Sequence, residues 1–107
     1  MDLCPHLQNG KGTIEKRTFL ENEDAAGAGR LFAIMTIQPG DSIGYHSHQN
    51  EYEVYYILKG RAKIVDDGET YELEEGDMMQ CKSGSSHSIE NVGEGPLEHL
   101  ALILSGR

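Results

Sequence analysis

Short runs of strand-forming residues alternate with glycine- and proline-rich turns along this chain, and no long stretch repeats at the helical period. The strongest turn signal is Asp66-Asp67-Gly68, which lies between two such runs and is typical of a β-hairpin. We therefore expect an all-β sandwich or barrel. The pattern predicts strands over residues 31–37, 53–59, 61–65, 70–73, 77–81, 86–91 and 97–104, with an edge strand over 13–20.

The length and the absence of a linker indicate one domain over residues 1–107. The first 20 or so residues are the least readable part, and we expect residues 1–12 to be mobile or to contact a second copy of the chain. No apolar run is long enough for a membrane span, and the N-terminus lacks the features of a secretory signal. These observations favour a cytoplasmic protein without a membrane partner.

Charge and cysteine content exclude two further classes. The net charge is −9, from 18 acidic and 9 basic residues, which argues against a nucleic-acid partner because phosphates would be repelled. Two cysteines, Cys4 and Cys81, do not make a disulfide framework. Cys81 is expected to behave as a small buried hydrophobe, with a role near a metal or in redox chemistry as the weaker alternative.

The candidate chemistry is a group of three histidines and one carboxylate: His46, His48, Glu53 and His87. Imidazole nitrogen together with carboxylate oxygen suits one divalent ion of iron, manganese, nickel or zinc. A turn over residues 49–52 would place His48 and Glu53 directly opposite each other on neighbouring antiparallel strands. Glu51 is the rival carboxylate, but it falls inside that turn. His87 must come from a later strand.

Other candidates follow from strand parity, because successive side chains point to opposite faces. Tyr55 shares the face of Glu53 and is the candidate catalytic residue, with a core aromatic as the equal alternative. Tyr56 should face outward, where it could meet a second copy. Arg30 could bind an anionic substrate at the mouth, although a solvated surface arginine is the more common case. His99 is expected to pack in the core.

Two further pairs are left open by the same parity argument. Phe32 and Met35 lie on opposite faces of their strand, so at most one of them lines a pocket. Gln80 and Cys81 also point oppositely, and the sequence does not choose between them.

The chain resembles the cupin superfamily, in particular its small single-domain members with one conserved barrel. The first cupin motif is Gly-x5-His-x-His-x4-Glu-x6-Gly, and the second is Gly-x5-Pro-x-Gly-x2-His-x3-Asn. Both are matched by spacing, except that Lys82 stands where the family has proline. The matching residues are Gly40, His46, His48, Glu53 and Gly60 in the first motif and Gly76, Gly84, His87 and Asn91 in the second.

The resemblance implies a double-stranded β-helix or jelly-roll barrel that holds a metal on His46, His48, Glu53 and His87. It also implies a homodimer packed sheet against sheet. The missing proline puts the rigidity of the turn before His87 in doubt.

Four protein ligands on an ion that prefers six leave positions open for a substrate. We therefore favour a metal-dependent enzyme that acts on a small polar molecule, as a dioxygenase, isomerase or decarboxylase. The alternative is a non-catalytic module that binds or senses a small ligand or sugar.

Overall fold

The computed structural model describes residues 1–20, 29–47 and 49–105. Within these ranges the chain forms ten strands and one short 3-10 helix. The elements are β1 (Asp2–Pro5), η1 (Leu7–Asn9), β2 (Thr13–Leu20), β3 (Gly29–Ile37), β4 (Ser42–Ser47), β5 (Glu51–Lys59), β6 (Arg61–Asp66), β7 (Glu69–Glu74), β8 (Met78–Cys81), β9 (Ser86–Asn91) and β10 (Leu97–Ser105). Among the described residues, no helix is long and apolar enough to cross a membrane.

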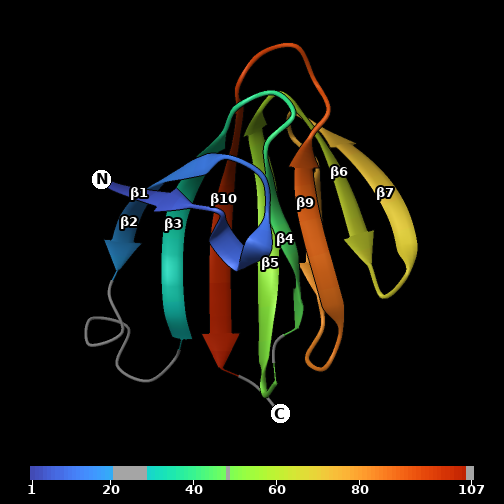
Figure 1. Cartoon of the computed structure of the whole chain (residues 1–107). Helices are drawn as coiled ribbons and strands as arrows, with labels where there is room; N and C mark the ends of the chain where they lie inside the picture. Colours follow the sequence, from blue (N-terminus) through green and yellow to red (C-terminus); the bar gives the residue numbers. More distant parts are fainter. Residues whose placement is uncertain (21–28, 48, 106–107) are drawn as a thin grey trace.

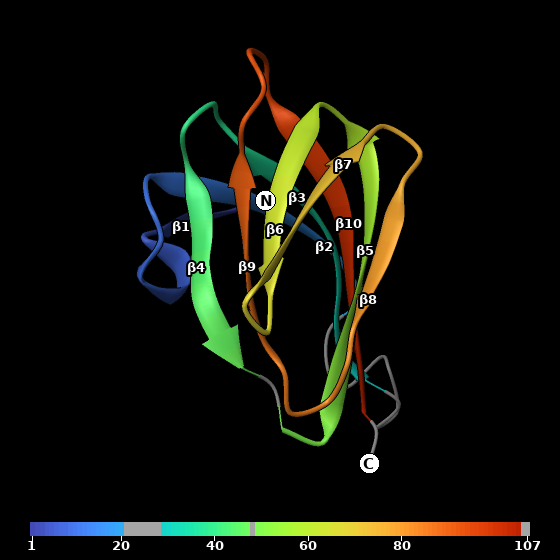
Figure 2. The ribbon, with the colours of Figure 1, turned by 90° about the vertical axis from the view of Figure 1, so that its right-hand side faces the viewer.

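The strands form two antiparallel sheets that face each other (Figures 1 and 2). The larger sheet has the order β1-β2-β3-β10-β5-β8, and the smaller one has the order β4-β9-β6-β7. From β3 onward the chain passes back and forth between the sheets, except at the β6–β7 hairpin within the smaller sheet, and this is the winding of a jelly roll. The all-β prediction is confirmed.

The predicted hairpin at Asp66-Asp67-Gly68 is present. β6 and β7 pair from Arg61 opposite Glu74 to Asp66 opposite Glu69, which leaves Asp67 and Gly68 as a two-residue loop. Both loop residues have positive φ angles, 49° at Asp67 and 86° at Gly68. A two-residue turn of this hand matches the twist of the flanking strands, and it requires residues such as Asp and Gly.

The core lies between the sheets, because alternate residues of each strand point inward. In β5, for example, Glu53, Tyr55 and Ile57 are buried while the residues between them are partly exposed. β10 shows the same alternation. The apolar cluster is formed mainly by Ile14, Met35, Ile37, Ile43, Ile57, Ala62, Ile64, Cys81, Ile89, Leu97 and Ala101. The burial of Met35 and Cys81 settles two alternatives that the sequence left open, since Phe32 is only partly buried and Gln80 is exposed.

Two expectations about strand neighbours are wrong. The strand over residues 13–20 is not an edge strand, because β1 pairs with its outer side and β3 with its inner side. β4 and β5 do not form a hairpin either: β4 pairs with β9, whereas β5 pairs with β10 and β8. The chain crosses to the opposite sheet after β4, so the residues of these two strands meet across the core.

The N-terminal segment reaches the rim of the sandwich. It forms β1, and η1 then packs against β4, as the blue part of Figure 1 shows. The contact is backbone to backbone: a Cβ built on Gly44 would lie 1.9 Å from the Gln8 carbonyl oxygen. A side chain at position 44 would therefore displace η1. Whether residues 1–12 also contact a second copy stays a prediction.

Candidate metal centre

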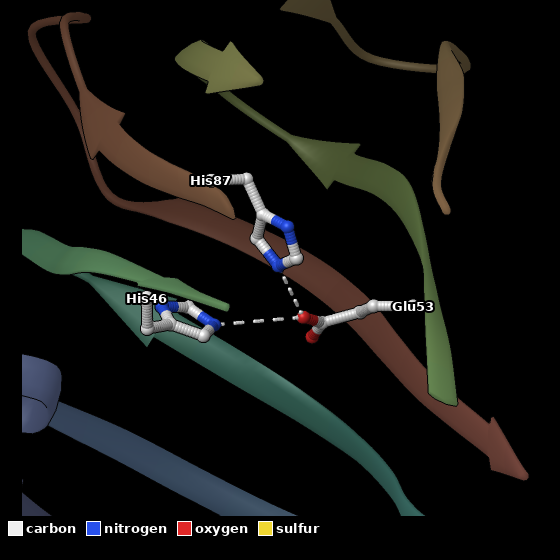
Figure 3. Close-up of side chains that lie close together, drawn as sticks. All are labelled: His46, Glu53 and His87. Carbon is white, nitrogen blue, oxygen red and sulfur yellow. Dashed lines mark hydrogen bonds and ion pairs between the residues drawn. The ribbon is translucent and has the colours of Figure 1, made fainter. Parts of the chain in front are cut away.

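Three of the four predicted metal ligands meet between the sheets (Figure 3). His46 on β4 lies directly opposite His87 on β9 in the smaller sheet, and Glu53 comes from β5 in the facing sheet. Strand alternation turns Glu53 and His87 inward. In β4 the register shifts between Ile43 and His46, and this irregularity brings His46 to the same inner face as the buried Ile43. His48, the fourth predicted ligand, lies outside the described residues.

Glu53 is the centre of this group. Its Oε1 lies 2.9 Å from His87 Nε2 and 3.9 Å from His46 Nε2. The two imidazole rings meet edge to face, with their centroids 4.6 Å apart. His87 is fully buried and Glu53 is 4 % exposed, so the carboxylate interacts with the imidazoles away from bulk water. The rival carboxylate, Glu51, instead forms an ion pair with Arg30.

The donor group fits a divalent ion. A candidate ligand atom from each of His46, Glu53 and His87 lies within 4.8 Å of the other two. Nitrogen and oxygen ligands of one ion sit about 2.0–2.2 Å from it, and therefore about 2.8–3.1 Å apart at octahedral angles or about 3.3–3.6 Å apart at tetrahedral angles. The separation of 2.9 Å between Glu53 and His87 lies in the octahedral range, and that of 3.9 Å between Glu53 and His46 is somewhat longer than either. One ion therefore fits after small side-chain shifts.

The backbone fixes the orientation of His46. Its Nδ1 lies 2.6 Å from the Gly44 carbonyl oxygen. A carbonyl can only accept a hydrogen bond, so Nδ1 carries the proton and donates it. In the neutral ring Nε2 is then the atom with the lone pair, and it faces Glu53. A bond to the second ring nitrogen is the usual way in which a metal-binding histidine is oriented.

Tyr55 supports the carboxylate from the same strand. Its hydroxyl donates to Glu53 Oε1 at 3.2 Å, and the residue is only 1 % exposed. Burial and the neighbouring negative charge of Glu53 raise the pKa of Tyr55 well above its usual value, so the phenol keeps its proton. Tyr55 is therefore a hydrogen-bond donor to the Glu53 carboxylate. Its catalytic role stays a prediction.

His99 packs beneath Tyr55, as its place on β10 predicts. The residue is fully buried, and its ring meets the Tyr55 ring edge to face at 5.0 Å. Its Nδ1 donates to the Leu100 carbonyl oxygen at 3.1 Å, while Nε2 has no hydrogen-bond partner among the described residues. Burial lowers the pKa of His99, and the Leu100 hydrogen bond and the charge of Glu53 only partly oppose this.

The lowered pKa of His99 predicts a loss of stability in acid. The unfolded chain takes up this proton near pH 6.5, whereas the folded chain resists it. The unfolded state thus binds more protons below that pH, and the free energy of unfolding falls as the pH drops. His99→Gln should flatten this dependence between pH 7 and 5, measured by urea denaturation of metal-free protein with chelator present. An unchanged slope would contradict the prediction.

A small cavity opens beside the donor group. Its volume is about 110 Å³, and His46, Glu53 and Tyr55 are among the residues that line it. The remaining lining residues are Leu7, Gln8, Lys16, Arg30, Leu31, Met35, Ile43 and Ile103. A cavity of this size holds a compact ligand. η1 forms part of its wall through Leu7 and Gln8.

Arg30 lies at this cavity, as the sequence suggested, but its charge is engaged. Its Nε lies 2.7 Å from Glu51 Oε2, and the arginine side chain remains 44 % exposed. An exposed pair of this kind contributes little to stability. The Glu51 carboxylate does, however, neutralise the positive charge with which Arg30 would otherwise attract an anion.

A second polar group lies behind His87. Asp66 is its direct neighbour on β6, and Cys81 is the direct neighbour of Glu53 on β8. Candidate ligand atoms of Asp66, Cys81 and His87 lie within 4.8 Å of one another. Burial raises the pKa of the Cys81 thiol to about 12, so the thiol stays protonated at neutral pH. This agrees with the expectation of a small buried hydrophobe.

The turn before His87 is held without the family's proline. The Lys82 carbonyl oxygen accepts hydrogen bonds from the Ser85 backbone amide at 3.1 Å and from the Ser85 hydroxyl at 2.6 Å. Ser85 is buried, although Lys82 itself is exposed. These bonds restrain the turn in place of the fixed φ angle of proline.

Asn91, at the end of the second motif, organises loops rather than the metal centre. Its amide nitrogen donates to the carbonyl oxygens of Ile37 and Gly95, both at 2.8 Å, and its side-chain oxygen accepts from the Gly93 amide at 2.8 Å. The residue is 1 % exposed. It therefore joins the turn after β3 to the loop before β10.

Sequence reasoning missed Gln8, Lys16 and Asp66. A signal existed for Lys16, because it stands two residues from Ile14 in a strand and so shares its inward face. Asp66 was read only as a turn residue. Gln8 carried no signal, since η1 is placed by tertiary contacts.

Comparison with known proteins relates the chain to one family. The model of the cupin domain matches residues 33–103. The oxalate-binding protein of Thermotoga maritima is 42% identical over 99 residues, which cover 92% of this chain and 82% of that protein. Oxalate decarboxylase of Bacillus subtilis is 31% identical over 75 residues, which cover 65% of this chain but only 20% of the longer enzyme.

A solved structure has the same fold over almost the whole chain. It is a predicted oxalate decarboxylase from Thermotoga maritima, with a TM-score of 0.94 and 40% sequence identity. The match covers 97% of this chain and 90% of that one. The similarity confirms the double-stranded jelly-roll barrel expected from the two motifs.

Proposed function

The chain belongs to the cupin domain family, and on this premise we propose that it binds one divalent metal ion and, on that ion, a small chelating dianion such as oxalate. The observation that carries the proposal is the buried meeting of His46, Glu53 and His87 beside a small cavity. A metal bound there would supply Lewis acidity toward the oxygen atoms of a ligand.

His46, Glu53 and His87 would hold the ion, and we include His48 as the fourth ligand. His48 follows His46 by two residues in the sequence motif that contains both. Iron, manganese, nickel and zinc all accept nitrogen and oxygen ligands of this kind. Tyr55 would keep the Glu53 carboxylate aimed at the ion through its hydrogen bond.

The size of the cavity and the relatives support oxalate as the ligand. A cavity of about 110 Å³ suits a compact ligand such as oxalate. An oxalate-binding protein and an oxalate decarboxylase are both similar to this chain in sequence. A chelator that occupies two metal positions would use the places that four protein ligands leave open.

Binding is the function that the lining residues support best. Among the described lining residues, Glu53 is the one carboxylate, and it faces the metal position rather than offering an independent acid or base. Decarboxylation is the second candidate, favoured by the similarity to the Bacillus subtilis enzyme. The homodimer and the cytoplasmic location stay predictions.

The test uses untagged protein that is stripped with chelator and reloaded with Fe²⁺, Mn²⁺, Ni²⁺ or Zn²⁺. We expect about one equivalent of metal by plasma mass spectrometry and calorimetric binding of oxalate only to the loaded protein. Oxalate at a hundredfold excess over Kd should raise the free energy of unfolding by about 2.7 kcal/mol. Acetate is the control ligand, and release of carbon dioxide is measured in parallel.

Each outcome separates the candidates. Binding without carbon dioxide supports a binding protein, whereas carbon dioxide release that requires the metal supports a decarboxylase. If the metal-loaded protein ignores oxalate, or if metal-free protein binds it equally well, the proposal is wrong.

A further inference from the structure

Lys16 points into the molecule from the middle of β2. It stands two residues after the buried Ile14 and directly opposite the buried Met35 of β3. Directly opposed residues of paired strands share one face of the sheet, so Lys16 belongs to the inner face. It lines the cavity together with His46 and Glu53. A lysine on the inner face of a small barrel is unusual, because burying an ammonium group is costly.

No ion pair or hydrogen bond joins the Lys16 side chain to another residue in the described part of the chain. Asp2, its neighbour on β1, is exposed and forms no ion pair with it. Arg30, the second cation at the cavity, is paired with Glu51 instead. Lys16 is therefore the cation whose three donor hydrogens remain available to a ligand in the cavity.

We propose that Lys16 binds the carboxylate oxygens of the ligand that face away from the metal, and so restricts the site to small dicarboxylates. The inference rests on the proposed function and identifies how the ligand is selected. A dicarboxylate that chelates an ion with one oxygen of each carboxylate keeps its two other oxygens directed outward. Those oxygens carry negative charge, and an ammonium group donates to them through charge-assisted hydrogen bonds.

Oxamate is the ligand that separates this role from general attraction of anions. It has the shape of oxalate, but an amide replaces one carboxylate, so it has one negative charge less. It also presents an N–H₂ group, which cannot accept a hydrogen bond from an ammonium group. A site that uses Lys16 should therefore prefer oxalate to oxamate.

The experiment compares Lys16→Met with Arg17→Met in the metal-loaded protein. Arg17 is the adjacent, exposed residue of β2, and its replacement removes the same charge from the same strand. We expect Lys16→Met to keep one equivalent of metal and to lower oxalate affinity about ten- to a hundredfold, the usual loss for a hydrogen bond to a charged group. Oxamate keeps one outward carboxylate oxygen, so its affinity should fall by a smaller factor than that of oxalate. Arg17→Met should resemble wild type, and Lys16→Arg should restore part of the preference.

The outcomes distinguish this inference from the proposed function. Metal-loaded wild type that fails to bind oxalate overturns both. Lys16→Met with unchanged oxalate affinity, or with equal losses for oxalate and oxamate, overturns the role of Lys16 and leaves the proposed function standing. If Lys16→Met does not fold by circular dichroism, Lys16→Gln is measured in its place against the same criteria.

Discussion

Replacing Glu53 with glutamine is expected to lower the affinity for a divalent metal by more than about a hundredfold. Changes to residues that merely orient a ligand cost ten- to a hundredfold, and this change removes the charge of a ligand itself. Glu53 Oε1 is the atom that both His46 and His87 face, at 3.9 and 2.9 Å. Metal affinity is measured by competition with a fluorescent chelator, and bound metal by plasma mass spectrometry.

The fold should survive this change. Glutamine keeps a side-chain oxygen that can accept from Tyr55, whose hydroxyl lies 3.2 Å from Oε1 of the native residue. The matched control is Glu94→Gln, which makes the same chemical change in an exposed loop residue. Retention of the metal by Glu53→Gln, or an equal loss in Glu94→Gln, would contradict the assignment of the centre.

Replacing Ile64 with alanine is expected to lower the free energy of unfolding by about 2–5 kcal/mol. Ile64 is fully buried in β6, between Ile89 of β9 and Tyr71 of β7 in the smaller sheet. Strands hold the surrounding backbone on both sides, so the space left by the side chain cannot close easily. Domains of this kind have a total stability of about 5–15 kcal/mol, and the loss is therefore a large share.

Urea denaturation of metal-free protein measures this loss. Lys63→Ala is the control, because Lys63 is the adjacent residue and points to the opposite, partly exposed face. It should cost less than about 1 kcal/mol. If both variants lose a similar amount of unfolding free energy, the loss comes from the low strand propensity of alanine in β6 and not from the lost core packing of Ile64.

Local sequence patterns predicted most of the strands because the responsible physics is local. Side-chain alternation and turn residues act over a few positions, and β6, β7 and β9 lie where these patterns place them. Asp67 and Gly68 adopt positive φ angles because their residue types tolerate them. β1 and η1 were not predicted, since their short segments carry no periodic pattern and are held by β2 and β4.

The error about β4 and β5 has a physical reason. An odd spacing between His48 and Glu53 requires the chain to change direction, and both a hairpin and a crossing to the opposite sheet satisfy this requirement. The choice between them depends on which strands pair most favourably in the whole fold. In this structure β5 pairs with β10 and β8, and β4 pairs with β9. Either solution turns Glu53 inward, so its prediction as a ligand did not depend on the hairpin.

The sequence by itself determined most of the strands, the main turns and the residue types of the candidate metal group, because residue type and spacing act locally. The tertiary structure decided which strands are neighbours. It thereby set the distances from Glu53 to His46 and His87 and brought Lys16 to the same cavity as His46 and Glu53. These properties arise from pairing between segments that are distant in the chain, and no local pattern encodes the choice among such pairings.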